Sequence, residues 1–274
     1  MKDNRAAAVV MSEAERKEKL RNQIYAVLPV ISVLLLIILW FVASSAENST
    51  FPSPLAIWER FLLLMEKPIK DLNLFGHIGA SLLRVFIALL AAWVLGISFG
   101  ILIGWNKKAN ALLGPLFTAF RSVPPLAWVP LMTMWFGTGE FPKILIVFIG
   151  ALMPVVVNTQ AGIANVQSMY LNVGTIFHAD KRQMLFEIAI PSALDAIFAG
   201  VRTSTSAGWM VVLAAKMLGG KSGIGFLITR GMESGDYALC LLSMVCIGLV
   251  GALLAIITQL LERMVCPWTA KKSS

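Results

Sequence analysis

The sequence has little charge and is mostly apolar. Only 14% of its 274 residues are Asp, Glu, Lys or Arg, whereas 58% are apolar, and the mean hydropathy is +0.78. Such a composition is too apolar for an ordinary soluble domain and favours a lipid bilayer as the solvent. Membrane spans of about 20 residues with short connections use most of a chain of this length, which excludes a large soluble domain beside them.

Residues that perform covalent chemistry are few and scattered. The three cysteines, Cys240, Cys246 and Cys266, have neither a CxxC nor a metal-ligand spacing, so no disulfide or metal site is expected. The two histidines, His77 and His178, have no acid, base or thiol beside them in a catalytic pattern. A Gly-rich phosphate loop followed by Lys-Ser/Thr is also lacking. The sequence therefore predicts a chain that is not an enzyme and binds no cofactor, ATP included.

The formal charge of +8 does not indicate a nucleic-acid partner. The basic residues lie at the ends of apolar runs and do not form a stripe with interleaved aromatics. Lys and Arg are retained on the cytoplasmic side of membrane proteins. With both termini placed inside, the cytoplasmic segments hold about twice as many basic residues as the outer segments. This bias predicts cytoplasmic termini.

Apolar runs separated by polar turns predict an all-α integral membrane protein of about six transmembrane helices. A polar cytoplasmic tail, 1–23, precedes a first transmembrane helix, 24–46. An outer-surface segment with an amphipathic helix, 47–79, follows. Residues 80–260 hold five more transmembrane helices, and residues 261–274 form a cytoplasmic tail.

Small residues recur every fourth position in the second span. Gly96, Gly100 and Gly104 share one face of the expected helix. Such spacing lets helix backbones approach closely in a bilayer. We therefore expect this span to pack tightly on a neighbouring helix.

The third span, expected from 112 to 136, contains four prolines, namely Pro115, Pro124, Pro125 and Pro130. Each proline removes a backbone donor and bends the helix, which hydrocarbon tolerates only where protein or water satisfies the freed carbonyls. This span is therefore expected to be kinked and to face the interior of the bundle.

Several sequence blocks, in order from about Phe51 to Trp268, resemble the permease subunits of bacterial ATP-binding-cassette (ABC) importers, most closely the nitrate, sulfonate and taurine branch. The blocks are Phe-Pro-Ser-Pro at 51–54, Ser-Leu-Leu-Arg-Val at 81–85, Arg-Ser-Val-Pro-Pro-Leu-Ala-Trp-Val-Pro-Leu at 121–131, Trp-Phe-Gly-Thr-Gly-Glu at 135–140, Asn-Thr-Gln-Ala-Gly at 158–162, the segment 191–202, and Gly-Ile-Gly-Phe-Leu-Ile at 223–228. The resemblance implies the type I ABC importer permease fold in a bacterial inner membrane.

The same resemblance implies a set of partners and a substrate class. Two copies of an ABC ATPase, carrying ATP and Mg²⁺, are expected to bind a dimer formed with a second copy of this permease. An external substrate-binding protein is expected to deliver a small anion such as sulfonate, taurine or nitrate. Related permeases carry pyrimidine vitamin precursors or riboflavin, which is the alternative substrate class. A channel or carrier that works without an ATPase is the alternative from a different functional class.

The polar segment 165–190 matches the loop by which permeases of that family bind the ATPase. The family pattern has Glu-Ala-Ala, then three residues and a glycine, then about a dozen residues and Leu-Pro. Here the pattern places Asn172-Val173-Gly174 at the first three positions and His178 at the glycine. A histidine in place of glycine makes a left-handed turn harder to adopt. The expected coupling residues are Asn172, Gly174, His178, Ala179, Asp180, Lys181, Arg182 and Pro191.

Polar residues inside the spans are candidates for the translocation path, namely Asn158, Thr159, Thr203, Thr205 and Lys216. For the hydroxyl and amide groups, hydrogen bonding between helices is the alternative interpretation. An ionisable group such as Lys216 within a span indicates a functional site or a snorkelling side chain. Arg84, Arg121 and Arg202 are interpreted as helix-end snorkelling or interhelical pairing.

Overall fold

The computed structural model describes residues 21, 25, 27–45, 50–213, 220 and 222–266. Helices are the regular elements of these residues, apart from an isolated antiparallel bridge between Ile69 and Leu72. The chain divides into two compact units, Met1–Glu59 and Arg60–Ser274, and each is described by itself.

The first unit contains an apolar helix at Val27–Ser44, inside the span expected at 24–46. Near its end Trp40 lies against Phe51, with ring centroids 6.4 Å apart, and the Trp40 indole N–H donates to the Pro52 carbonyl at 3.0 Å. These contacts hold the Phe-Pro-Ser-Pro segment, residues 51–54, against the end of the apolar helix Val27–Ser44. The amphipathic helix expected next is α2, Pro54–Glu66.

The second unit begins its membrane part with α3, Leu74–Trp105, a helix of 32 residues. It starts six residues before the expected boundary at 80 because Asn73 caps it, its side chain accepting the Gly76 N–H at 2.9 Å. At the far end Asn106 ends α3 and its side chain caps the next helix, α4, Lys107–Arg121.

The third expected span is discontinuous. It consists of α4, a 3₁₀ turn η1 at Pro125–Trp128, and α5 at Val129–Phe136. Pro124 has an extended backbone, with ψ of 141°, because the ring of a following proline disfavours the helical region. The helix therefore ends at Arg121, and the expected kink is a complete break in this span.

The glycine face of α3 packs on α6, Glu140–Ala164. A Cβ built at Gly96 would lie 2.9 Å from Val155, one at Gly100 would lie 2.6 Å from Thr159, and one at Gly104 would lie 3.0 Å from Ile163. No side chain fits between the two helices at these points. The close packing predicted from the glycine spacing is confirmed, and α6 is the neighbour.

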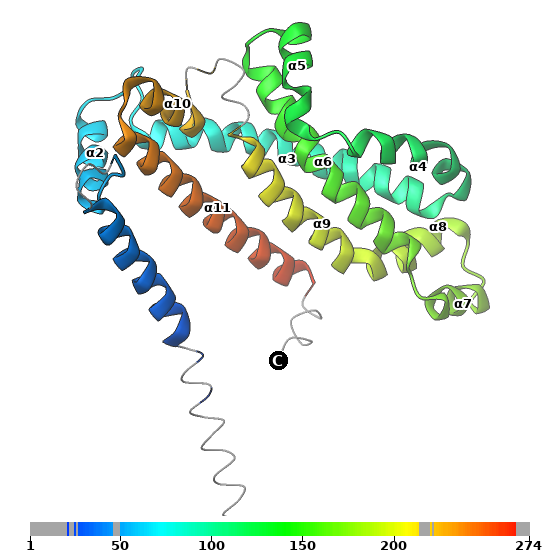
Figure 1. Ribbon diagram of the computed structural model, residues 1–274. Helices are drawn as coiled ribbons and strands as arrows, with labels where there is room; N and C mark the ends of the chain where they lie inside the picture. The colour runs from blue at the N-terminus through cyan, green and yellow to red at the C-terminus, as the bar shows by residue number, and fades with distance from the viewer. Residues whose placement is uncertain are drawn as a thin grey trace, which may run out of the picture. The chain divides into compact units, whose positions relative to one another are not determined.

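On its other flank α6 packs on α9, Ile190–Val211, which in turn contacts α11, Tyr237–Val265 (Figure 1). The remaining elements are α7 at Ser168–Ile176, α8 at Lys181–Gln183, the π-helical turn η2 at Met184–Ala189, and α10 at Ile224–Ser234. In the described residues, five helices are long and apolar enough to cross a membrane. The discontinuous segment is the sixth span expected from the sequence, and its crossing stays a prediction.

Candidate translocation and coupling sites

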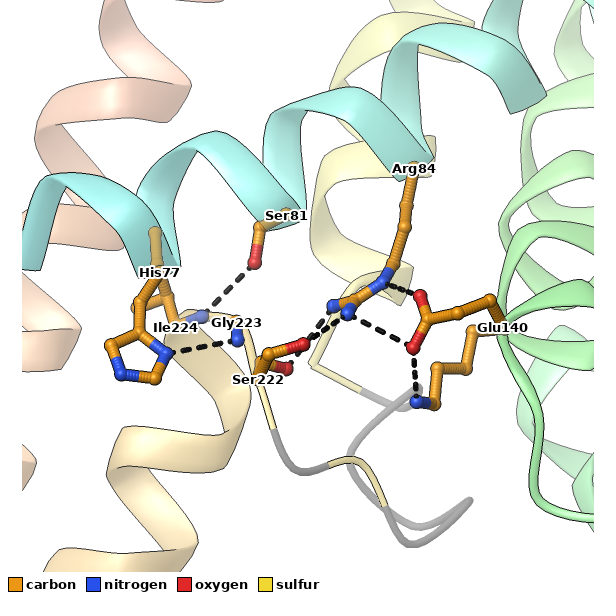
Figure 2. Close-up of polar contacts among 8 residues, drawn as sticks. His77, Ser81, Arg84, Glu140, Ser222, Gly223 and Ile224 are labelled. Carbon is orange, nitrogen blue, oxygen red and sulfur yellow. Dashed lines mark hydrogen bonds and ion pairs between the residues drawn. The ribbon is translucent and has the colours of Figure 1, made fainter. Parts of the chain in front are cut away.

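An ion cluster of two nearly buried cations and one carboxylate, whose side chain is 58% exposed, joins α3, α6 and the segment before α10. Both carboxylate oxygens of Glu140 accept from the Arg84 guanidinium, and Lys143 Nζ donates to the same carboxylate at 2.8 Å (Figure 2). Arg84 also donates to the carbonyl and the hydroxyl of Ser222, at 3.1 and 2.6 Å. The side chains of Arg84 and Lys143 are only 10% and 4% exposed. Two cations thus share one carboxylate, so this cluster, the Arg84 cluster, carries one excess positive charge.

The first backbone N–H groups of α10 are satisfied by side chains of α3. His77 Nδ1 accepts the Gly223 N–H at 3.1 Å, and Ser81 Oγ accepts the Ile224 N–H at 3.0 Å (Figure 2). Because Nδ1 is an acceptor, the ring proton lies on Nε2, which is 3.1 Å from the Ile69 carbonyl and donates to it. A neutral imidazole therefore fixes the start of α10 to the start of α3.

Only glycine suits position 223. Its φ is +103°, and a Cβ there would lie 2.7 Å from Arg84 Nη1 and 2.9 Å from Ser81 Oγ. Any side chain would strain the backbone and displace the guanidinium. Gly223 therefore lets the loop approach the Arg84 cluster.

Two of the three arginines inside the spans are paired as interpreted from the sequence. Arg84 pairs with Glu140, and Arg202 of α9 pairs with Glu262 of α11 at 3.0 Å. These interhelical pairs are confirmed. Arg121 is exposed at the end of α4, and within the described ranges no ion pair or hydrogen bond involves its side chain.

The expected coupling loop forms a compact hairpin of α7, α8 and η2. Gly174 of α7 is buried, and a Cβ at this position would lie 2.5 Å from both Met184 and Ile188. At Gly174 the backbone of α7 therefore lies directly against side chains of η2. The structure places Gly174 as the contact that brings the two arms of the hairpin together.

The turn after α7 forms a Schellman motif, with the left-handed residue at His178. Its φ is +55°, its N–H donates to the Thr175 carbonyl at 3.1 Å, and the Ala179 N–H donates to the Gly174 carbonyl at 2.9 Å. Glycine is the usual residue at this position. The left-handed turn is therefore kept although a histidine occupies it.

Replacing this histidine by glycine is expected to stabilise the hairpin. A non-glycine residue in the left-handed region costs about 1 kcal/mol, which His178→Gly removes. We expect slower proteolysis of this loop in His178→Gly, measured by limited digestion of the purified protein. His178→Ala, which keeps the strain, is the control, and equal digestion rates in the two variants would contradict the argument.

The remaining expected coupling residues lie after the turn, in α8 and at the start of α9. Asp180 caps α8 by accepting the Gln183 N–H at 2.6 Å, while the Gln183 side chain accepts the Asp180 N–H at 2.9 Å. Lys181 lies in the same short helix, and the Arg182 guanidinium lies 6.0 Å from the Phe186 ring centroid. Pro191 lies in the first turn of α9, where no backbone donor is needed.

One face of α7 is exposed, and no described residue covers it. Asn172 and Val173 are exposed, and at the tip of the hairpin Ile176 is 72% exposed and Phe177 is 80% exposed. Large apolar side chains gathered on a tip mark an interaction surface more often than single scattered ones do.

The path candidates on α6 make contacts within the bundle. Asn158 donates to the Pro154 carbonyl at 2.8 Å, one turn earlier in the same helix. Thr159 is fully buried against Gly100, and its hydroxyl has no hydrogen-bond partner among the described residues. A role for either in the path stays a prediction.

The candidates on α9 bond back to their own helix. Thr203 is exposed and donates to the Ala199 carbonyl at 2.8 Å, and Thr205 is buried and donates to the Val201 carbonyl at 2.9 Å. Thr205 also lines a cavity of about 130 Å³ shared with α11. Lys216 lies outside the described residues.

Comparison with known families gives a match over most of the chain. Residues 96–271 match the family model described as binding-protein-dependent transport system inner membrane component. A nitrate import permease protein of Synechocystis sp. is 35% identical over 87% of this chain and 89% of its own length. The taurine transport system permease protein of Escherichia coli is 32% identical over 86% of each chain. A bicarbonate transport system permease protein of Synechococcus elongatus is 34% identical over 86% of this chain and 88% of its own length.

A solved structure shares the fold. A chain of the MetNI methionine ABC transporter in an inward-facing conformation has a TM-score of 0.62 and 16% sequence identity, covering 70% of this chain and 95% of its own. The expected type I importer permease architecture is confirmed by this similarity.

Proposed function

Because the chain belongs to the family of binding-protein-dependent transport system inner membrane components, we propose that it forms the translocation path of an importer for a small oxyanion. The relatives that support this class are named for nitrate, bicarbonate and taurine transport. Each of these solutes carries a negatively charged oxygen group. The Arg84 cluster supports this class, because it places one excess positive charge at the start of α6.

The energy for import comes from a partner. An ABC ATPase binds ATP and Mg²⁺ and closes on them, and the hairpin of α7, α8 and η2 transmits that motion to α6 and α9. Two ATPase copies bind a dimer of this permease, and an external binding protein delivers the anion. The observation that carries this proposal is the exposed tip formed by Ile176 and Phe177, which no part of the described chain covers.

The tip provides a direct test by co-purification with the cognate ATPase. An aspartate at the centre of an apolar contact leaves a desolvated charge without a partner, and such anchors are worth 2 kcal/mol or more. We therefore expect Phe177→Asp to lower ATPase recovery by at least about ten-fold. Ser168→Asp, at the exposed start of the same helix, adds the same charge away from the tip and is the control.

Two results would argue against this assignment. Recovery of the ATPase that is equal in Phe177→Asp and in Ser168→Asp would remove the tip from the interface. Anion movement by the purified chain in proteoliposomes without any ATPase would support a channel or carrier.

A further inference from the structure

The discontinuity between α4 and α5 lies beside the middle of α6, a helix long and apolar enough to cross a membrane. Pro125 lies beside Gly150 of α6, and Phe117 packs with Val156 of the same helix. At about 1.5 Å per residue, Gly150 is about 15 Å from the start of α6 and Val156 is about 12 Å from its end. Arg121 lies between Phe117 and Pro125, so its backbone is close to the bilayer midplane.

An exposed arginine at this depth is unstable in hydrocarbon. A charge at the bilayer centre costs at least several kcal/mol, and no arginine side chain covers half of a layer about 30 Å thick to reach the surface. The exposed face of Arg121 must therefore meet water or a counter-ion, because lipid provides neither.

Among the described residues of Arg60–Ser274, no carboxylate is available for Arg121. Glu140 is the sole acidic residue between Asp71 and Asp180, and Arg84 and Lys143 bind it at the start of α6. The other acidic residues of the spans lie towards the opposite end, namely Glu187, Asp195 and Glu262, of which Glu262 pairs with Arg202. A second copy has the same sequence, so it offers no midplane carboxylate either.

A stripe of mostly polar residues runs along α4 from its first residue, Lys107, to its last residue, Arg121. Its members lie three or four residues apart, and so on one face, in the order Lys107, Asn110, Gly114, Thr118 and Arg121. Asn110 accepts a hydrogen bond from Gln160 of α6 at 3.1 Å, and the Thr118 hydroxyl donates to the Gly114 carbonyl. The stripe thus offers water polar side chains at Lys107, Asn110 and Thr118 on the way to Arg121.

From this position, exposure and lack of a counter-ion, we infer that Arg121 lies in the water-filled translocation path and is the residue that selects anions there. This inference rests on the proposed function for its substrate class. The transported oxyanion is the transient counter-ion of the guanidinium, which offers a planar fork of N–H donors suited to carboxylate-like and oxyanion geometry. In a dimer, two copies of Arg121 would face one path.

Charged thiol reagents test the position and the charge without any substrate. In a parent whose native cysteines are replaced by alanine, Ser122→Cys places a thiol beside Arg121. We expect an anionic methanethiosulfonate to react faster than a cationic one in membrane fragments open on both sides. Adding Arg121→Gln should lower the ratio of the two rates by about ten-fold, because the guanidinium attracts one reagent and repels the other.

Leu249→Cys is the matched control, because Leu249 is 67% exposed near the middle of α11. A thiol near the bilayer midplane that contacts only lipid should not react with either charged reagent. Reactivity at Ser122→Cys no greater than at Leu249→Cys, or a ratio unchanged by Arg121→Gln, would overturn the inference.

Uptake by the complete transporter separates this inference from the proposed function. With the ATPase and external binding protein present, nitrate, bicarbonate and taurine are the probes. We expect Arg121→Gln to lower uptake by at least about ten-fold with normal ATPase recovery, and Arg121→Lys to retain more uptake than Arg121→Gln. Full uptake in Arg121→Gln overturns the role of Arg121 only. Anion-selective thiol chemistry without uptake of any of the three probes overturns the proposed substrate class only.

Discussion

Glu140→Gln is expected to destabilise the protein strongly, whereas Lys143→Met is expected to leave its stability unchanged or higher. Arg84 and Lys143 are nearly buried and share the Glu140 carboxylate. Removing that carboxylate leaves two adjacent cations without a counter-charge, which costs about 2–4 kcal/mol. Removing Lys143 leaves a balanced pair of Arg84 and Glu140, and methionine fills a similar volume.

The measurement is the apparent melting midpoint of the detergent-solubilised protein. For Glu140→Gln we expect a fall of roughly 6–10 °C. The double variant Glu140→Gln/Lys143→Met should recover part of this loss, since it contains one cation fewer. Glu233→Gln, at an exposed glutamate near the end of α10, controls for loss of a surface charge. Equal midpoints for Glu140→Gln and Glu233→Gln would show that the Arg84 cluster contributes nothing to stability.

Gly100→Leu is expected to prevent α3 and α6 from packing. Even a Cβ at Gly100 would lie 2.6 Å from Thr159 Cβ and 3.0 Å from the Val156 carbonyl oxygen. The carbonyl belongs to the helix backbone and moves only with α6 as a whole. Overpacking of this kind costs about 1–3 kcal/mol for small additions, and a whole leucine at such a crossing exceeds that range.

A smaller series keeps the argument testable if Gly100→Leu yields no folded protein. Gly100→Ala should lower the melting midpoint, and Gly100→Ala/Thr159→Gly should recover part of the loss because the opposing Cβ is removed. Gly79→Ala is the control on the same helix, since no atom lies within 4 Å of a Cβ there. Similar midpoints for the two alanine variants would mean that the α3–α6 crossing adjusts easily.

The spans and the glycine contact were predictable because both depend on local patterns. Hydropathy over about 20 residues locates a span, and a four-residue spacing of glycines defines one helix face. The boundaries were less predictable. Asn73 starts α3 earlier than hydropathy indicates, because a capping hydrogen bond needs only one well-placed side chain.

Sequence patterns indicated interhelical pairing of the arginines inside the spans but did not identify their partners. Arg84 binds Glu140 and Ser222, which are 56 and 138 residues away along the chain. Such pairing depends on which helices are neighbours, and neither spacing nor composition encodes that. Sequence patterns also did not indicate that Arg121 has no partner among the described residues, since the same interpretation applied to Arg84, Arg121 and Arg202.

At the turn after α7, by contrast, the sequence resemblance located a structural feature correctly. The resemblance placed a glycine of the family at position 178, and the structure has a left-handed residue there, with φ of +55°. A backbone requirement therefore persists where the residue that meets it most easily has been replaced.

The divided third span also bears on how this protein enters the membrane during synthesis. Its apolar part, Pro125–Phe136, is too short to cross a bilayer alone, and α4 presents a polar stripe that lipid would reject. The translocation machinery recognises segments by their hydrophobicity, so residues 107–136 lack a strong insertion signal of their own. We therefore expect residues 107–136 to insert together with α3 before them and α6 after them, as one cooperative unit.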